Sequence, residues 1–579
     1  MNLHYTSEKN AQLLIALMKK RGIRKVIVSP GAQNICFVGS IQSDRFFEIY
    51  SAPDERSAAY MACGMAAESG EAVALSCTGA TASRNYFPAL TEAYYRKLPI
   101  LAVTATKHQA FVGQNVPQVI DRSVVSNDIA KMSIYVPTIL CEDDEWGAVV
   151  KLNTALLELT RDGGGPVHIN LETTHSADYS VTELPDVRVI DRIRTGEPFT
   201  RPGRNRKIVV FAGEHGKWSE ELTNAVDAFC EVYNAVVLCD HTSNYHGKFK
   251  VLPAMTLFQT QYRSPLADID LLIEIGNVSG AYYPLKPREV WRIHPDGEIR
   301  DQFRKLRYVF EMEEERFFRR CLPKEAAPAS TSHYEAWKNE YAELAGLIHD
   351  LPYSNIWMAG EFSKAIPENT VLHLAILNSL RSWNFYYMPA SVDCYCNTGG
   401  FGIDGPVSTV MGGALADPDR VHFLVTGDLA FFYDMNAMGN RHFPSNVRIL
   451  LVNNGIGTEF KNYNHKAARF GDSADLYMAA GGHYGCKSAD LVRHYAQDLG
   501  FTYMTASSKE EFLEVLPGFT DLSAEGPMVF ETFTNSADES DAYKVMKTLK
   551  SSPEGAAKAF AKKLLGKENA DRLKRTLGR

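Results

Sequence analysis

The sequence lacks any apolar run that approaches the roughly 20 residues a helix needs to cross a bilayer. Its N-terminus, MNLHYTSEKNAQLLIALMKKRG, is interrupted by polar residues and is typical of an amphipathic helix rather than a secretory signal. The ten cysteines form no CxxC array and no Cys/His spacing suited to zinc. We therefore expect a cytoplasmic protein with reduced cysteines and no structural zinc.

Strong charge of one sign is also absent from most of the chain. The net charge of −8 argues against extensive nucleic-acid binding. Only residues 541–579 are basic, with 11 Lys and Arg against 4 Asp and Glu. We expect this segment to be a solvated helical tail. The alternative is docking on an anionic membrane or an acidic partner, because Phe560, Leu564 and Leu565 would form one apolar face.

Short apolar runs bounded by Gly or Pro alternate with helical patterns along the whole chain. Such runs are typical of strands that are buried on both faces of a parallel sheet. The strands expected are KVIVSPG, AVALSCTG, PILAVTA and PVHINLE, then KIVVFAG, NAVVLCD, LLIEIGN and EVWRIHP, then TVLHLAI, HFLVTGD, VRILLVNN and PMVFETF.

The 579 residues are too many for a single hydrophobic core. The strand pattern predicts the α/β class, with three doubly wound parallel-sheet domains at residues 1–190, 205–325 and 335–540. The polar stretches IDRIRTGEPFTRPGRNR and PKEAAPASTSH are expected to be the linkers between them.

Polar residues follow two consecutive strands of the third segment. Gly427-Asp428 ends one strand, and Asn453-Asn454 ends the next. Ligands collect at the carboxyl ends of parallel strands, so a carboxylate and an amide are expected at adjacent strand tips. Oxygen ligands of this kind suit Mg²⁺. The alternative is a helix N-cap at Asp428 and a simple turn at the two asparagines.

This spacing resembles the metal and diphosphate motif of thiamine-diphosphate enzymes, which have three α/β domains in the same order. The resemblance implies that Asp428, Asn454 and the Ile456 carbonyl bind Mg²⁺. The stretch NTGGFGIDGPVSTVMGGALA resembles a third signature of the family, in which Ile403 is an apolar wedge beneath the cofactor. The residues that the resemblance places against the cofactor are Glu55, Gly402, Ile403, Gly427, Asp428, Leu429, Asn454, Ile456 and Gly457.

The stretches VSPGAQN, APDERSAAYMACGMA and TGATASRNYFPALTEA resemble the pyrimidine-binding domain of the same family, and Glu55 matches its glutamate. In the family this carboxyl group drives the cofactor's aminopyrimidine to the tautomer that accepts the C2 proton. An apolar setting, with Ala58 and Gly64 keeping the helix close to its neighbours, would raise the pKa of such a group. The alternative is an acid that only stabilises the helix start.

The resemblance also implies that the two half-sites meet across a subunit interface. A homodimer is then the minimal active unit, and a homotetramer is the larger assembly expected. An FAD group is not expected, because KIVVFAGEHG has no dinucleotide fingerprint.

Within the family, SPGxxN, DERSA, GxGIDGxxST and GDLxxxYDxNA are most similar to 2-succinyl-5-enolpyruvyl-6-hydroxy-3-cyclohexene-1-carboxylate synthase. That enzyme adds a succinyl group from 2-oxoglutarate to isochorismate, and arginines hold both polyanions. At the matching places this sequence has Gln33, Lys107, Trp383 and Thr398, so only one positive charge remains. Arg381, two positions before Trp383, is the alternative source of a compensating positive charge, although on a helix it is expected to point elsewhere.

The remaining candidates for the substrate site are mostly neutral. Gln118 matches a glutamine near the cofactor, and His108 is a candidate general acid or base. Glu459 suggests a hydroxyl-bearing or cationic acceptor, or else is an exposed loop acid. The substrate walls expected are Gln33, Asn34, Lys107, His108, Gln114, Gln118, Trp383, Glu459 and Phe460.

The arginine-poor site predicts an enzyme that decarboxylates a small 2-oxo acid and transfers the acyl group to a neutral acceptor such as a keto sugar. The alternatives are the isochorismate reaction above, acetolactate-type ligation and simple decarboxylation. A non-catalytic binding subunit is the alternative outside the enzymes. It would be favoured by loss of Glu55, Asp428 or Asn454, and all three are present.

Overall fold

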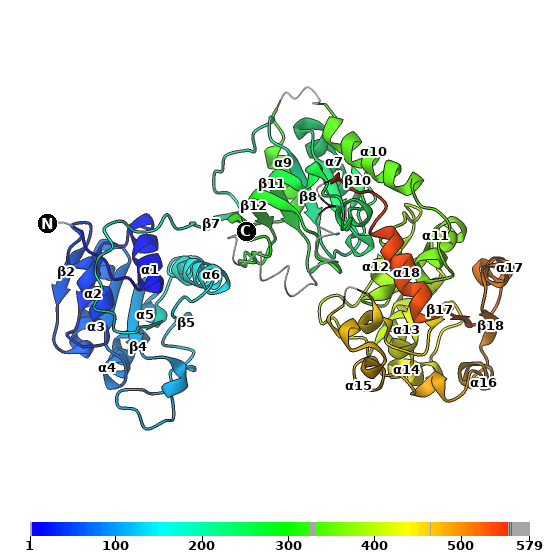
Figure 1. Cartoon of the computed structure of the whole chain (residues 1–579). Coiled ribbons are helices and arrows are strands. Elements are labelled where there is room, and N and C mark those ends of the chain that lie inside the picture. Colours follow the sequence, from blue (N-terminus) through cyan, green and yellow to red (C-terminus); the bar gives the residue numbers. More distant parts are fainter. Residues whose placement is uncertain (1–2, 325–329, 464, 554, 556, 558–579) are drawn as a thin grey trace. The chain divides into compact units, whose positions relative to one another are not determined.

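The computed structural model describes residues 3–324, 330–463, 465–553, 555 and 557 (Figure 1). The chain divides into two compact units: unit 1 is Met1–Arg194 with Gly297–Val309, and unit 2 is Thr195–Asp296 with Phe310–Arg579. Unit 1 contains one sheet and unit 2 contains two, with helices between many of the successive strands (Figure 1).

The sheet of unit 1 has six parallel strands in the order β2-β1-β3-β4-β6-β5. Its four inner strands are rich in β-branched and small apolar residues, and nearly every position in them is buried. The strands are β1 (Lys25–Val28), β2 (Glu48–Ser51), β3 (Val73–Cys77), β4 (Ile100–Thr106), β5 (Met132–Val136) and β6 (Val167–Glu172).

Helices cover both faces of this sheet, and each face has its own apolar core. One face packs against α1 (Lys9–Lys20), α2 (Ile35–Ile41) and α6 (Glu142–Glu158). The other packs against α3 (Glu55–Ser69) and α5 (Phe87–Arg96), with the short α4 (Thr81–Asn85) between them in sequence. A double covering of this kind is what buries parallel strands on both sides.

The first sheet of unit 2 contains the parallel order β10-β9-β8-β11-β12. Two further strands, β7 (Asp191–Arg194) and β13 (Leu306–Glu311), lie at the boundaries between the units in sequence. The strands are β8 (Ile208–Ala212), β9 (Val236–Cys239), β10 (Lys250–Val251), β11 (Asp268–Ile275) and β12 (Lys286–Ile293), and the helices are α7 (Glu220–Tyr233), α8 (Ala254–Leu257), α9 (Glu314–Cys321) and α10 (Ser332–Gly346).

The second sheet of unit 2 has six parallel strands in the order β15-β14-β16-β17-β19-β18. The strands are β14 (Val371–Leu374), β15 (Asp393–Tyr395), β16 (His422–Gly427), β17 (Val447–Asn453), β18 (Thr502–Ala506) and β19 (Met528–Phe533). The helices are α11 (Asn355–Ala365), α12 (Asn378–Trp383), α13 (Pro406–Ala416), α14 (Asp428–Asp434), α15 (Ala474–Tyr477), α16 (Leu491–Asp498), α17 (Lys509–Thr520) and α18 (Ser536–Met546).

This sheet is also covered on both faces. An aromatic-rich core beneath α11, α12 and α17 lies on one face, and a second core beneath α13, α14 and α16 lies on the other. The two central strands β16 and β17 contribute side chains to both cores, which holds their carboxyl ends in place.

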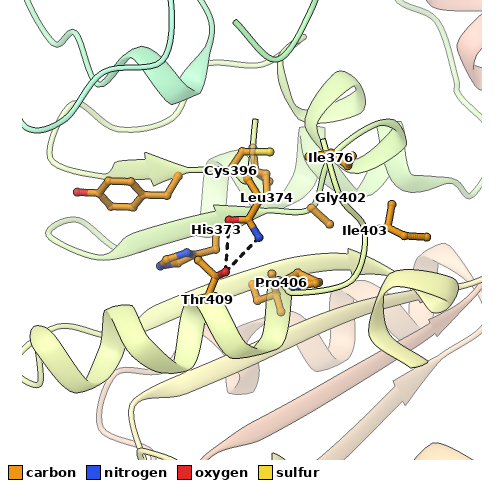
Figure 2. A pocket seen from close by; sticks show the side chains of 12 residues that line it. His373, Leu374, Ile376, Cys396, Gly402, Ile403, Pro406 and Thr409 are labelled. Carbon is orange, nitrogen blue, oxygen red and sulfur yellow. Dashed lines mark hydrogen bonds between the residues drawn. The ribbon is translucent and has the colours of Figure 1, made fainter. Parts of the chain in front are cut away.

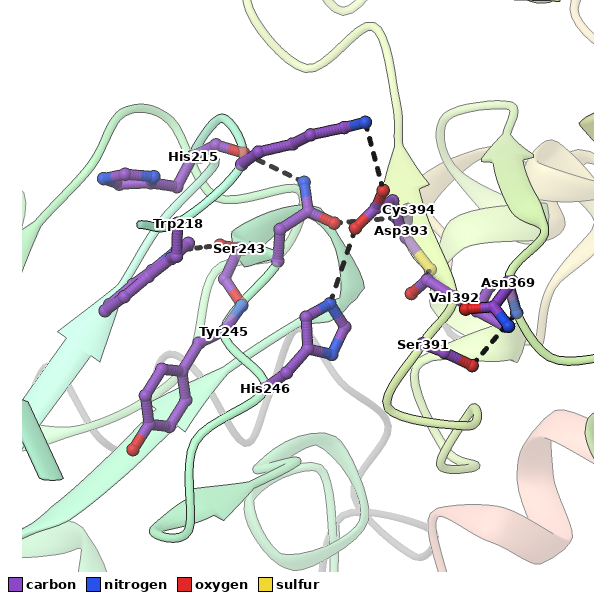
Figure 3. A network of polar contacts seen from close by, with 12 residues as sticks. His215, Trp218, Ser243, Tyr245, His246, Asn369, Ser391, Val392, Asp393 and Cys394 are labelled. Atoms are coloured by element: carbon purple, nitrogen blue, oxygen red, sulfur yellow. Dashed lines mark hydrogen bonds and ion pairs between the residues drawn. The ribbon is translucent and has the colours of Figure 1, made fainter. Parts of the chain in front are cut away.

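A polar network joins the two sheets of unit 2 (Figure 3). The buried Asn244 side chain accepts a hydrogen bond from the Cys394 N–H at 2.7 Å and donates one to the His215 carbonyl at 3.0 Å. Next to it, His246 and Arg420 lower the pKa of Asp393 to about 2. Because these contacts link loops from both sheets, they fix the two sheets as one body.

The predicted α/β class with three doubly wound parallel sheets is confirmed. The domain boundaries at residues 190, 205, 325, 335 and 540 stay a prediction. The first predicted linker is not wholly irregular, because it contains β7. All ten cysteines are unpaired, as expected.

The C-terminal tail is described only in part. α18 continues to Met546, and most of the segment beyond residue 553, with Phe560, Leu564 and Leu565, lies outside the described residues. Within the described part of the chain, no helix is long and apolar enough to cross a membrane.

We predict that Asn244→Ala destabilises unit 2 by about 2 to 4 kcal/mol, because it leaves a buried N–H and a partly buried carbonyl without partners. Urea unfolding midpoints would measure the loss. Asn369→Ala is the matched control: Asn369 has a similar positive φ of 58° but an exposed side chain, and we expect a cost of about 1 kcal/mol or less. Equal midpoint shifts in the two variants would contradict this role of Asn244.

Candidate functional site

The predicted meeting point of two strand tips is present in unit 2. β16 ends at Gly427, α14 begins at the next residue, and Gly427 pairs with Val452 of the parallel neighbour β17. Asp428 and Asn454 therefore leave adjacent strands at the same edge of the sheet. Both line a cavity of about 110 Å³. Its other walls are Asn355, Ala375, Ile376, Leu377, Asn378, Ser379, Ile403, Gly427, Leu429, Ala430, Val452, Ile456, Gly457, Thr458, Glu459, Phe460 and Glu539.

The carboxyl group of Asp428 is buried without a cation. Its side chain is 5% exposed, and its Oδ1 accepts a hydrogen bond from the Leu429 N–H at 2.9 Å. Burial raises its pKa to about 6, and the nearby Glu531 raises it further, against the lowering by backbone N–H donors. Among the described residues Asp428 has no ion-pair partner, so its charged form lacks compensation.

The two asparagines after β17 have different tasks. Asn453 donates to Glu531 at 2.6 Å and accepts from the Gly455 N–H at 3.2 Å, so its amide is used to shape the turn. Asn454 lines the cavity, and its Oδ1 accepts one weak hydrogen bond from the Ile456 N–H at 3.3 Å. Only the second asparagine therefore offers an oxygen to a ligand in the cavity.

The glycine-rich loop before α13 brings Ile403 to the same place. Ile403 lines the large cavity and also a smaller one of about 10 Å³, shown with its walls in Figure 2. A Cβ at Gly402 would lie 2.3 Å from the Asp404 carboxylate, so a larger residue here would have to displace the exposed Asp404 side chain. The loop is anchored where Asn397 donates to Thr409 at 3.1 Å (Figure 2).

Glu55 lies in unit 1, at the first turn of α3. It is half-buried and accepts a hydrogen bond from the Asn85 amide at 3.3 Å, while Asp54 caps the helix by accepting from the Ser57 N–H. The predicted small-residue packing is correct for Ala58, which is fully buried. It is wrong for Gly64, which is exposed and has open space around its Cα.

The other candidates of unit 1 fall into two groups. Gln33 and Asn34 are buried and already bonded: Gln33 accepts from the Gly79 N–H, and Asn34 donates to the Ser29 carbonyl. Lys107, His108, Gln114 and Gln118 lie on the more exposed loop after β4. The His108 Nδ1 accepts from the Ala110 N–H at 3.1 Å, which caps the short helical turn there.

Comparison with known proteins agrees with this geometry. Residues 8–125 match the family described as "Thiamine pyrophosphate enzyme, N-terminal TPP binding domain". Two relatives named 2-succinyl-5-enolpyruvyl-6-hydroxy-3-cyclohexene-1-carboxylate synthase are each 31% identical. The match with the relative from Phocaeicola vulgatus covers 92% of this chain and 96% of the relative. The match with the relative from Bacteroides thetaiotaomicron covers 92% of this chain and 97% of the relative. A relative of the same name from Flavobacterium johnsoniae is 27% identical, and the match covers 90% of this chain and 96% of the relative.

The chain belongs to this synthase family of thiamine-pyrophosphate enzymes. Thiamine pyrophosphate, also called thiamine diphosphate, is therefore its cofactor. The cavity residues fit such a group: an uncompensated buried carboxylate suits a divalent cation, and Asn454 and the Ile456 carbonyl offer further oxygens. The individual ligand assignments stay a prediction.

In this thiamine-pyrophosphate enzyme, one expected substrate contact, Trp383, and the expected direction of Arg381 differ from the structure. Trp383 is 0% exposed, lies in an apolar core and donates to the Asn355 side chain at 2.9 Å, so its prediction as a substrate wall is wrong. Arg381 does not point elsewhere: it forms two 2.7 Å bonds to the Glu459 carboxylate at the edge of the cavity. Phe460 does line the cavity, as predicted.

Glu539 of α18 also lines the cavity and was not expected from the sequence. Its side chain is 8% exposed, and its Oε1 accepts from the Asn355 N–H at 3.0 Å and from the Thr534 hydroxyl at 2.9 Å. Burial raises its pKa to about 7. Helix α18 follows the last strand of the sheet, and no motif in the sequence connects it with the strand tips.

We predict that Asp428→Asn stabilises the cofactor-free enzyme above pH 6. The folded-state pKa of Asp428 is raised from 3.8 to about 6, so the native state loses stability as the pH rises through this window, by about 3 kcal/mol in total. The variant lacks this loss. Thermal unfolding between pH 4 and 8 would measure it, with the exposed Asp419→Asn as the control.

In the presence of Mg²⁺ and the cofactor, we expect the effect of Asp428→Asn on thermal stability to have the opposite sign. With thiamine diphosphate and Mg²⁺, wild type should gain thermal stability at pH 7 and lose that gain below about pH 6, whereas Asp428→Asn gains none. Equal stabilisation of both proteins by the metal would show that Asp428 is not a ligand.

Proposed function

We propose that this enzyme removes CO₂ from a small 2-oxo acid and joins the remaining acyl group to an acceptor through a new C–C bond. The observation that carries the proposal is the match with the named synthases over nearly the whole chain, together with the cavity at the β16 and β17 tips. The names of the relatives favour 2-oxoglutarate and isochorismate as the substrates. The sequence motifs alone favour a neutral acceptor over isochorismate.

The residues have distinct roles in this proposal. Bound thiamine diphosphate would supply the nucleophilic carbon and the electron sink that decarboxylation needs. Glu55 would hold the proton shared with the pyrimidine ring nitrogen, and its bond from Asn85 orients the carboxyl group. Asp428 and Asn454, which line the cavity, would hold Mg²⁺, and Ile403 of the same cavity would support the cofactor.

One observation favours a second candidate, in which the acceptor is neutral and bears hydroxyl groups. The walls of the cavity include three acids, Asp428, Glu459 and Glu539, and no Lys or Arg among the described residues. The nearest guanidinium, Arg381, is already paired with Glu459. A dicarboxylate acceptor would have to displace Glu459 from this pair, whereas a hydroxyl group could donate to it.

The proposal includes a homodimer with an active site at each interface. The buried alanines of α3 leave its opposite face exposed, and Tyr60 and Met61 on that face are 48% and 37% exposed. Apolar side chains next to a catalytic residue suit contact with a second copy of the chain. The larger homotetramer is the other assembly consistent with this proposal.

A substrate panel tests the reaction. The protein with thiamine diphosphate and Mg²⁺ would be incubated with 2-oxoglutarate or pyruvate, alone and with isochorismate or a nucleotide-linked keto sugar, and released CO₂ and product mass measured. We expect 2-oxoglutarate and isochorismate to give a joined product. Joining only to the keto sugar would support the second candidate, and no CO₂ from any donor would refute both. Glu55→Gln should lower turnover by about 100-fold or more.

Mixing two inactive variants tests the shared site. If Glu55 of one chain serves Asp428 of another, co-expressed Glu55→Gln and Asp428→Asn chains form mixed dimers with one intact site. About a quarter of wild-type activity should then return, because half of the dimers are mixed. The control pairs Glu55→Gln with the double variant, which leaves no intact site. No recovery in the first mixture would place the whole site within one chain.

A further inference from the structure

We propose that unit 1 contains a separate binding site for a small carboxylate, built around Arg122. This residue lies just beyond the loop of Lys107, His108, Gln114 and Gln118 and matches no family motif quoted above. Its side chain is 7% exposed. Burial of a guanidinium without an anion costs folding free energy, so its contacts indicate whether it binds a ligand.

The guanidinium of Arg122 is only partly used by the protein. Its Nη2 donates to the Ala105 carbonyl at 2.9 Å. Its Nε and Nη1 are buried and have no hydrogen-bond partner, and no carboxylate within the described chain forms an ion pair with it. Two donors of a fork that matches a carboxylate are therefore unsatisfied.

Arg122 is one of the residues that line a cavity of about 60 Å³. Its polar walls include Thr106, Gln109, Ser123 and Asn170, and the Asn170 Oδ1 is also buried without a partner. One water-sized probe needs roughly 10–15 Å³, so the space holds a carboxylate with a short chain but not a whole nucleotide. The unsatisfied amide oxygen suits a hydroxyl group or a water that accompanies the ligand.

The charged groups around the cavity favour a ligand with a single negative charge. Arg84 donates to the Asp121 carbonyl at 3.0 Å and, with Arg122, lines a smaller adjoining cavity of about 10 Å³. Burial lowers the pKa of Arg122 to about 10, with a smaller contribution from Arg84, so Arg122 stays charged at neutral pH. Burial also lowers the pKa of His168 to about 3, which keeps that neighbour neutral.

One acid is part of the wall. The exposed Asp121 carboxylate accepts a hydrogen bond from the Ser123 N–H at 2.9 Å. It would repel a dianionic phosphate more strongly than a single carboxylate, and a phosphate would need more donors than one half-used fork provides. The chemistry of the site therefore selects a small carboxylate, from the 2-oxo acid donor or from another metabolite.

The site can be tested on the protein without cofactor, so its failure is separate from that of the proposed function. Pyruvate, propionate, 2-oxoglutarate and glutarate would be titrated at constant ionic strength and followed by calorimetry and by thermal unfolding. We expect saturable binding and a higher unfolding temperature. Arg122→Gln should weaken binding by about tenfold or more, because charge-assisted bonds are lost. The exposed Arg45→Gln is the matched control and should bind as wild type.

The variant Arg122→Met tests the effect of removing the buried positive charge. We expect it to abolish binding while the cofactor-free protein unfolds at the same or a higher temperature, because an unpaired buried charge is removed. Arg122→Lys, which keeps the charge but not the fork, should bind more weakly than wild type. If neither Met nor Gln folds, the Lys variant and the wild-type titrations still decide the matter.

The pairs of ligands distinguish the source of the carboxylate. Tighter binding of pyruvate than propionate, or of 2-oxoglutarate than glutarate, with a raised donor KM in Arg122→Gln, would identify the donor. Equal binding within each pair and an unchanged KM would identify another metabolite. No saturable binding to wild type, or equal binding to wild type and Arg122→Gln, would mean that water fills the cavity and would overturn the proposal.

Discussion

The parallel pairing of β16 with β17 determines where the chemistry of this chain lies. Parallel neighbours end at the same edge of a sheet, and the register of Gly427 with Val452 brings Asp428 and Asn454 to that edge. A shift by one residue would turn the buried side chains of β17 to the wrong faces and separate the two polar groups. Packing on both faces fixes this register, so the core of the sheet holds the site in place.

The charge balance of the cavity follows from this placement. Burial raises the pKa values of both Asp428 and Glu539, and Arg381 and Glu459 neutralise each other. An anionic diphosphate would meet repulsion in such a cavity unless a cation came with it. A divalent cation therefore has two tasks in the proposed enzyme: it compensates Asp428, and it makes the cavity acceptable to the diphosphate.

The sequence predicts the inner strands of the three sheets better than the edge strands. Each of the twelve expected runs corresponds to an observed strand, whereas β2, β5, β7, β10, β13, β15 and β18 were not expected. All of these except β13 lie at sheet edges, and their partly exposed residues lack the continuous apolar pattern of a doubly covered strand. Side-chain direction was harder still: Trp383 and Arg381 lie on the same short helix, and only the packing of α12 shows which of them is buried.

The family motifs, which contain few arginines in this sequence, also missed the buried positive charge of Arg122. Matching residues to family motifs examines only the positions that the motifs contain, and Arg122 lies outside them. Asp428 in unit 2 and Arg122 in unit 1 are two buried charged groups that no described residue pairs with an opposite charge, and their signs are opposite. An isolated buried charge destabilises a fold unless something binds to it. The two proposed ligands match these signs, a cation at Asp428 and a carboxylate at Arg122.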